Sequence, residues 1–151
     1  MPLPDELRPI TPGILVGGLA AAATTGALLA MGRRTGSATL PFAEIGATVF
    51  RGTVSRGAVG LTLAGFALHI AATIAWSFAF VWIAERMRRR DLVAAMIVAV
   101  GQFVVSWIVA SSTAAGLASA LPLGDRLAFS VVLAVALVVG MRFALPVLRN
   151  A

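Results

Sequence analysis

Four long stretches of the chain contain no Asp, Glu, Lys or Arg, and this feature limits the possible folds more than any other. They run from Pro9 to Gly32, Gly57 to Ala84, Leu92 to Gly124, and Leu127 to Met141 with an apolar continuation. Because an α-helix rises about 1.5 Å per residue, about 20 apolar residues cover a hydrocarbon core of about 30 Å. The sequence therefore predicts an all-α, polytopic integral membrane protein with four transmembrane helices.

The composition supports this prediction and narrows the expected partners. Hydrophobic residues make up 60% of the chain and charged residues 12%, against about 25% charged residues in an ordinary soluble domain. The net charge of +6 comes from arginines that lie beside the apolar stretches, where arginine sets orientation and meets lipid phosphates. We therefore expect membrane lipids as partners and no nucleic acid. The absence of cysteine excludes disulfides and thiolate metal ligands.

The charged and turn-forming residues place the boundaries. We expect one membrane domain over residues 1–151, with spans at about 10–32, 57–84, 92–119 and 126–146. The short charged segment from Glu85 to Asp91 leaves so little chain that the second and third spans must form an antiparallel hairpin. Pro122 and Gly124 end the third span, and Asp125 is placed to cap the fourth.

The segment at about 40–52, between the first two spans, has a pattern of its own. Pro41 suits a first helical turn, and Phe42, Ile45 and Val49 recur at helical spacing, with Glu44 off that stripe. This pattern predicts a short amphipathic helix that lies in the headgroup plane. An extended loop and a re-entrant segment are the alternatives, and Glu44 makes the re-entrant segment costly.

The arginines also predict an orientation. The N-terminus, the turn after the second span and the C-terminus share one face, which holds seven arginines; the other face holds five. The seven are Arg8, Arg86, Arg88, Arg89, Arg90, Arg142 and Arg149, and the five are Arg33, Arg34, Arg51, Arg56 and Arg126. The positive-inside rule then places both termini in the cytoplasm. The bias toward Ala, Gly, Val and Arg indicates a GC-rich bacterial genome and hence the bacterial inner membrane.

Small residues mark where helices can approach closely. In the first span they form two ridges at four-residue steps: Gly13, Gly17, Ala21 and Thr25, and beside them Gly18, Ala22, Gly26 and Ala30. In lipid, close backbone approach along such ridges is a main source of helix association. The ridges fit either packing inside the bundle or contact with another protein chain, and the sequence does not separate the two.

The second span carries the only histidine of the chain, on a stripe of small and polar residues. Gly65, His69, Thr73 and Ser77 follow each other every four residues and so share one face of the helix. Counted from the hairpin turn, Ser106 should lie level with His69, and Gln102 level with Thr73. We therefore expect His69, Thr73, Gln102 and Ser106 to share hydrogen bonds inside the membrane.

An ionisable residue inside a membrane is a candidate functional site, and three interpretations of His69 stay open. A neutral imidazole bonded to Ser106 or Gln102 would fix helix register. An axial ligand to haem or bacteriochlorophyll is the second, because neutral imidazole binds such metals and Gly65 would leave room for a flat macrocycle. A proton or substrate site in a small transporter is the third.

No catalytic constellation is evident, because the carboxylates Glu44, Glu85, Asp91 and Asp125 all lie outside the predicted spans. No group of residues has the spacing of a metal site. We therefore expect no enzymatic activity, but an accessory, stabilising or assembly subunit that contacts other integral membrane subunits through its small-residue ridges. The cofactor-binding and transport interpretations of His69 are the alternatives.

Overall fold

The computed structural model describes residues 10–50, 59–88, 90–112 and 122–149, and these residues form five α-helices and no strand. The helices are α1 (Ile10–Arg34), α2 (Leu40–Phe50), α3 (Val59–Arg86), α4 (Asp91–Ser112) and α6 (Leu123–Arg149). Four of them, α1, α3, α4 and α6, are long and apolar enough to cross a membrane, and α2 is a shorter apolar helix. The predicted fold class is confirmed. The last residues of the predicted third span, 113–119, lie outside the described residues.

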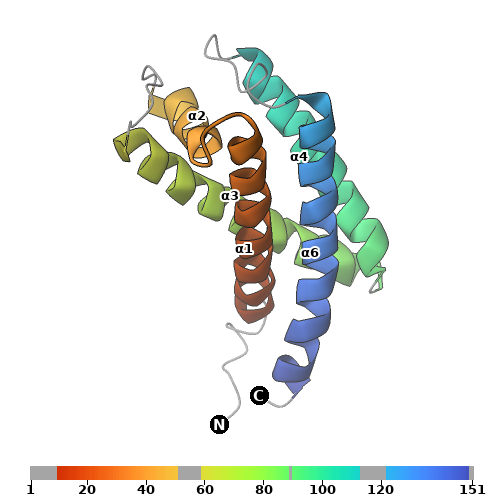
Figure 1. Cartoon of the computed structure of the whole chain (residues 1–151). Helices are drawn as coiled ribbons and strands as arrows, with labels where there is room; N and C mark the ends of the chain where they lie inside the picture. Colours follow the sequence, from red (N-terminus) through yellow and green to blue (C-terminus); the bar gives the residue numbers. More distant parts are fainter. Residues whose placement is uncertain (1–9, 51–58, 89, 113–121, 150–151) are drawn as a thin grey trace.

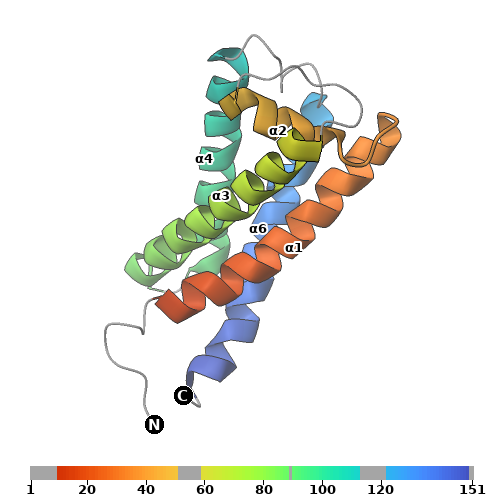
Figure 2. The same ribbon diagram turned by 90° about the vertical axis from the view of Figure 1, so that its left-hand side faces the viewer.

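The four long helices alternate in direction along the chain (Figures 1 and 2). The starts of α1 and α4 and the ends of α3 and α6 gather at one end of the bundle, whereas α2 lies at the other end. The start of α1, the turn between α3 and α4, and the end of α6 therefore share one face of the bundle. We call this the terminal end, and the opposite one the α2 end.

A glycine ends α1 and directs the chain into α2. Gly36 has a φ of 95°, a left-handed conformation that glycine adopts without steric cost. Its backbone N donates to the carbonyl of Arg33 at 3.2 Å, and the N of Ser37 donates to the carbonyl of Gly32 at 2.9 Å. These two bonds form a Schellman motif, which satisfies carbonyls that the helix end would otherwise leave unpaired.

The core of the bundle lies toward the terminal end. All four long helices contribute fully buried side chains there, among them Val16, Phe80, Val98, Leu137 and Met141. Alanines on α3, α4 and α6 lie between these larger side chains and let the helices approach. We call this cluster the terminal core.

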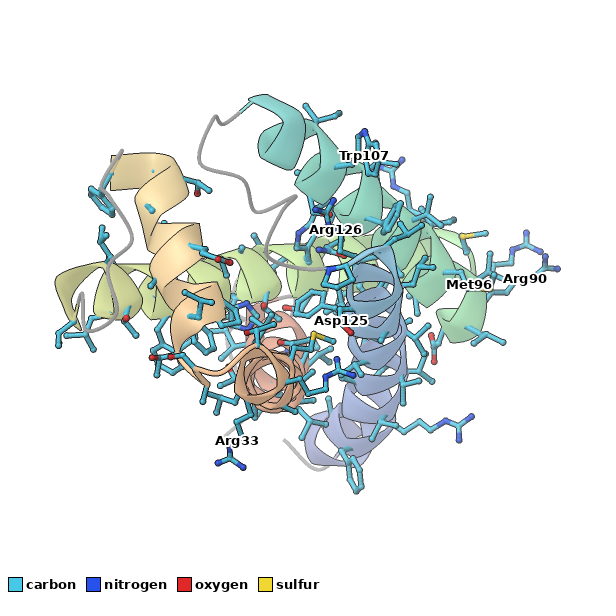
Figure 3. The ribbon with its side chains drawn as sticks, turned by 45° about the horizontal axis from the view of Figure 1, so that its top comes forward. Arg33, Arg90, Met96, Trp107, Asp125 and Arg126 are labelled. Carbon is cyan, nitrogen blue, oxygen red and sulfur yellow. The ribbon has the colours of Figure 1, made fainter. Side chains whose placement is uncertain are left out.

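The predicted hairpin of α3 and α4 is present, but the two helices diverge beyond their turn. α4 packs more extensively against α6 than against α3, and α3 runs at a steep tilt to α1 and α6 (Figures 1 and 3). The divergence separates the C-terminal half of α4 from α3. It leaves space at the α2 end that the terminal core does not have.

The short helix α2 occupies part of that space by packing directly on α3. A Cβ added at Gly65 would overlap the carbonyl oxygen of Phe42, and one added at Gly46 would overlap the carbonyl oxygen of Leu61. The two glycines therefore allow backbone contact between the helices. Of the predicted apolar stripe on α2, Phe42 is buried in this contact and Val49 is 57% exposed on the outer surface.

Candidate functional site

The two small-residue ridges of α1 have different surroundings. Gly13 and Gly17 are buried against α3, where an added Cβ would meet the Phe78 ring or the Ser77 hydroxyl. The Ser77 hydroxyl oxygen also lies 2.7 Å from the carbonyl oxygen of Gly13 and 2.6 Å from that of Ile74 on its own helix, so both carbonyls are within reach of its proton. The first ridge therefore packs inside the bundle.

The second ridge faces outward. Gly18, Ala22, Gly26 and Ala30 are all exposed, and an added Cβ at Gly18 or Gly26 would meet no other atom within 4 Å. Packing within this chain thus accounts for one predicted ridge and leaves the other on the outer surface of α1.

The predicted stripe on α3 is buried at all four positions, Gly65, His69, Thr73 and Ser77. These positions have different neighbours: Gly65 contacts the backbone of α2, and Ser77 contacts the backbone of α1. Thr73 donates its hydroxyl proton to the carbonyl oxygen of His69, one turn back on its own helix, at 2.8 Å.

His69 is bonded to α1, and this corrects the predicted partners. Its Nε2 lies 3.1 Å from the hydroxyl oxygen of Thr24, and only 6% of the residue is exposed. The predicted partners bond elsewhere: Ser106 donates to the carbonyl of Phe103 at 2.7 Å, and the Gln102 amide oxygen accepts from Ser130 at 3.0 Å. The prediction assumed that α3 and α4 remain side by side, and they do not.

The surroundings of Thr24 fix the direction of this hydrogen bond. The Thr24 hydroxyl lies 2.7 Å from the carbonyl oxygen of Ala20, which can only accept a proton. Because a hydroxyl has a single proton, Thr24 donates it to Ala20 and accepts from His69. The imidazole is therefore the tautomer with its proton on Nε2, and this proton is used within the bundle.

The residues around His69 do not fit an axial ligand to a macrocycle. Nε2 is used by Thr24, and the rings of Phe42 and Phe129 stand edge-on to the imidazole with centroids 5.8 and 6.0 Å away. Gly65, expected to leave room for a flat cofactor, is filled by the α2 backbone. Haem or bacteriochlorophyll binding at His69 would require α1, which carries Thr24, and α2, which fills the space at Gly65, to move.

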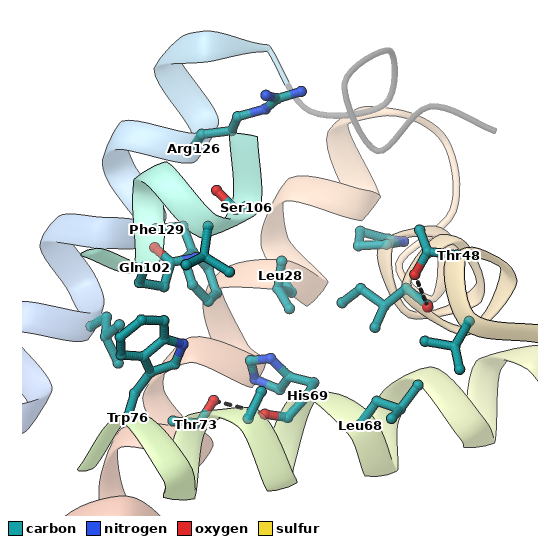
Figure 4. A pocket seen from close by; sticks show the side chains of 16 residues that line it. Leu28, Thr48, Leu68, His69, Thr73, Trp76, Gln102, Ser106, Arg126 and Phe129 are labelled. Carbon is teal, nitrogen blue, oxygen red and sulfur yellow. Dashed lines mark hydrogen bonds between the residues drawn. The ribbon is translucent and has the colours of Figure 1, made fainter. Parts of the chain in front are cut away.

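A cavity of about 310 Å³ lies beside His69 at the α2 end, in the space left by the divergence of α3 and α4 (Figure 4). All five described helices contribute to its wall. The polar or charged side chains that line it are Thr48, His69, Thr73, Gln102, Ser106 and Arg126. Figure 4 shows Arg126 and His69 on opposite sides of the cavity, with Ser106 and Gln102 on the α4 wall between them.

The four predicted intramembrane polar residues, His69, Thr73, Gln102 and Ser106, all line this cavity. Thr73 bonds the backbone carbonyl of His69, whereas Gln102 and Ser106 bond other residues. Sequence reasoning missed Phe129 and Arg126 as members of the same wall. The available signal was the position of Arg126, which lies between two apolar stretches near the start of the fourth span.

Two arginines stack on the tryptophans nearest the helix ends. The Arg86 guanidinium lies 4.3 Å from the ring centroid of Trp82, and that of Arg126 lies 5.8 Å from the ring centroid of Trp107. Both tryptophan side chains are more than half exposed, Trp82 at 56% and Trp107, beside Arg126, at 55% (Figure 3).

Two carboxylates at the α2 end have different environments. Asp125 forms an ion pair with Arg34, N to O 2.5 Å, which joins the end of α1 to the start of α6. Glu44 on α2 is half-buried, and its Oε2 has no hydrogen-bond partner. Because burial disfavours the charged carboxylate, the pKa of Glu44 is raised from 4.5 to about 7.

No family model, curated protein or solved structure matches this chain. Its class therefore rests on the fold: a helical membrane protein with four long apolar helices, one short apolar helix and a polar-lined cavity at one end of the bundle. Among the described residues, no three His, Asp or Glu side chains are grouped so that they could hold a metal ion.

Proposed function

We propose that the chain is a non-catalytic accessory, stabilising or assembly subunit of a larger membrane protein complex. The observation that supports this most directly is the outward-facing ridge of Gly18, Ala22, Gly26 and Ala30 on α1. Its partner would be another integral membrane subunit that packs its own helix against this ridge.

The physical reason is the cost of glycine in a helix. A glycine inside a helix destabilises it by about 1 kcal/mol relative to alanine, and exposure to lipid offsets none of this cost. Gly13 and Gly17 offset it by close contact with α3, and Gly65 by close contact with α2. Gly18 and Gly26 have no such contact in the chain itself, and a neighbouring helix would supply one.

Single cysteines test this proposal cleanly, because the chain contains none. Gly18→Cys and Ala22→Cys place a thiol on the ridge, and Val100→Cys places one on α4, where the side chain is 62% exposed. Each variant would be labelled in native membranes with a photoactivatable maleimide and irradiated. We expect the two ridge variants to give the same discrete adduct with a second protein, and Val100→Cys to give none.

Two results would contradict the proposal. An adduct of twice the mass of the chain would assign the ridge to a second copy of itself. Identical adducts from all three positions would show that the ridge has no preferred partner, and no adduct from the ridge would show that this face of α1 meets only lipid.

We further propose that the protein resides in the bacterial cytoplasmic membrane with both termini on the cytoplasmic side. The arginines that support this at the terminal end include Arg86, Arg88, Arg90 and Arg142. An impermeant thiol reagent applied to intact cells would test it with Arg90→Cys and Thr35→Cys, at opposite ends of the bundle. We expect labelling of the Thr35→Cys variant only; labelling of the Arg90→Cys variant alone would reverse the orientation.

A further inference from the structure

We propose that the cavity beside His69 binds a neutral alcohol with a single hydrocarbon chain. Its hydroxyl would donate a hydrogen bond to Nδ1 of His69, and its chain would lie against the apolar part of the wall. This site is separate from the outward ridge of α1 and does not depend on the proposed function.

The second ring nitrogen of His69 carries a lone pair that no described residue uses. The single proton of the neutral imidazole is on Nε2 and is donated to Thr24, so Nδ1 is an acceptor. The polar groups of α1 beside the ring cannot donate to it. The Thr24 proton goes to the carbonyl of Ala20, and the carbonyl of Ala21, which also contacts the imidazole, can only accept. A side chain that is 94% buried therefore lacks one donor, since only 6% of the residue is exposed.

This lone pair opens on the cavity. Figure 4 shows the imidazole projecting from α3 into the cavity, which His69 lines. Among the described residues, the enclosed side-chain atoms without a hydrogen-bond partner are Glu44 Oε2 and Asp91 Oδ1, so Nδ1 of His69 is not enclosed. Because an unpaired buried acceptor is costly, a ligand that donates a proton would be stabilised at this point.

The hydroxyl groups on the wall are acceptors as well. Thr48, Thr73 and Ser106 donate their protons to backbone carbonyls of their own helices, at 2.6 to 2.8 Å, so their oxygens keep lone pairs that face no donor of their own. Thr73 lies one turn from His69 on the same face of α3. A ligand hydroxyl suits these acceptors, whereas a carboxylate would bring its own lone pairs against theirs.

The depth of His69 also favours a neutral headgroup. His69 lies ten residues into the 28-residue helix α3, about 15 Å along it and farther from the other end. A charge at such a depth in a membrane is expensive, but a hydroxyl with a hydrogen-bond acceptor is not. Among the described residues no Asp or Glu lines the cavity, so a cationic headgroup would find no carboxylate there.

The rest of the wall suits a single hydrocarbon chain. Each described helix contributes an apolar side chain, including Leu28, Ile45, Leu68, Val105, Phe129 and Leu133. At about 30 Å³ for each water-sized group, 310 Å³ takes about ten such groups. This corresponds to one chain of about ten carbons, whereas a phospholipid carries two chains and a glycerol.

Trp76 lines the cavity about two turns from His69 and provides the measurement. In a Trp82→Phe, Trp107→Phe background, Trp76 is the only tryptophan. Decanol with bromine on the carbon next to its hydroxyl-bearing carbon would quench the fluorescence of Trp76 when it is bound in the cavity. The purified protein would be titrated in a mild detergent, with ligand concentrations expressed as mole fractions in the detergent.

We expect saturable quenching by one equivalent of this alcohol. Its methyl ether, which cannot donate a hydrogen bond, should bind about fivefold more weakly. This comparison needs no substitution at His69, so it tests the headgroup contact even if a His69 variant fails to fold.

Two pairs of variants locate the site. His69→Phe removes the acceptor and should bring alcohol and ether to equal affinity, whereas Ser77→Ala, on the same face of α3 but outside the cavity, should keep the fivefold difference. Ala72→Phe fills the cavity and should abolish saturable quenching. Ala71→Phe adds the same ring at the neighbouring exposed position, which does not line the cavity, and should leave quenching unchanged.

Four outcomes would overturn the proposal. Equal affinity for the alcohol and its ether, or a preference that survives in a folded His69→Phe variant, would remove the contact with His69. Tighter binding of the brominated decanoate would assign the cavity to an ionised headgroup. Saturable quenching in a folded Ala72→Phe variant, with its helical circular dichroism intact, would place the ligand outside the cavity. Quenching that never saturates would mean that the alcohol acts only from the detergent.

Discussion

The two ends of the bundle are built differently, although both are made from the same four apolar helices. At the terminal end, Phe80, Val98 and Leu137 from three helices pack to 1% exposure or less. At the α2 end, α3 and α4 have separated, and a cavity with polar side chains on its wall lies between them. In lipid, burial from water does not drive helix association, so close packing has to hold the helices together. The tightly packed terminal end is therefore the scaffold, and the incompletely packed α2 end is where a ligand can enter.

The largest effect is expected from a substitution that disrupts the terminal core. Leu137→Ala removes a side chain with 0% exposure and should lower the free energy of unfolding by about 2 to 5 kcal/mol, because neighbouring helices cannot fill the space. Leu68→Ala, at the half-buried cavity wall, should cost clearly less. Thermal melts of both variants in the same detergent measure the difference. Equal losses would mean that the two ends are packed alike.

A smaller change tests the junction of α2 and α3. Gly65→Ala adds a Cβ that would overlap the carbonyl oxygen of Phe42, and the clash should cost about 1 to 3 kcal/mol. Gly60→Ala is the control on the same helix, since an added Cβ there meets no other atom within 4 Å, and it should stabilise the helix slightly. Chemical denaturation in detergent shows whether each substitution raises or lowers the free energy of unfolding. A neutral Gly65→Ala would contradict the close contact of the two helices.

The buried carboxyl of Glu44 predicts a pH dependence at the α2 end. Its pKa is about 7 in the folded protein and 4.5 ordinarily, so between these values the folded state binds more protons than the unfolded state. Stability should therefore be highest below about pH 4.5 and fall as the pH rises to 7. Melting temperatures measured across this range, with Glu44→Gln as control, test the sign. In the Glu44→Gln variant the melting temperature should fall less between pH 4.5 and 7 than in the unsubstituted protein. An unchanged pH dependence would mean that another group causes it.

The hydrogen bond between His69 and Thr24 should give the smallest of these effects. Polar contacts between helices in membranes contribute about 0.6 kcal/mol on average and rarely more than about 1.7. A double-mutant cycle with Thr24→Val and His69→Phe should give a coupling free energy in that range, and a parallel cycle of His69→Phe with Ser106→Ala should give none. Coupling to Ser106 instead would restore the partner that the sequence suggested.

The contrast between the two ends also explains how far sequence reasoning reached. Charge-free stretches predicted the four long helices, because a membrane accepts few alternatives to a helix of that length. The buried stripe from Gly65 to Ser77 followed from helical periodicity alone. Both predictions concern one helix at a time.

The residues that contact these helix faces from other helices could not be predicted in the same way. Counting residues from the turn placed Ser106 level with His69, but this assumes nearly parallel axes, and the tilt of α3 brings His69 to Thr24 instead. The cavity was not predicted either, because its wall combines side chains from five helices that are far apart in the sequence. Which residues meet across a bundle depends on the crossing angles, and no single segment encodes them.

The difference between the two ends can be measured directly at two neighbouring positions of α3. Thr73 and Ser77 lie one turn apart on the same buried face, at 3% and 0% exposure, but Thr73 lines the cavity and Ser77 packs against the α1 backbone. In this cysteine-free chain, Thr73→Cys and Ser77→Cys would be reacted with a small thiol reagent in detergent. We predict that the Thr73→Cys variant reacts much faster than the Ser77→Cys variant. Equal rates, or faster reaction at position 77, would contradict an open α2 end above a closed terminal core.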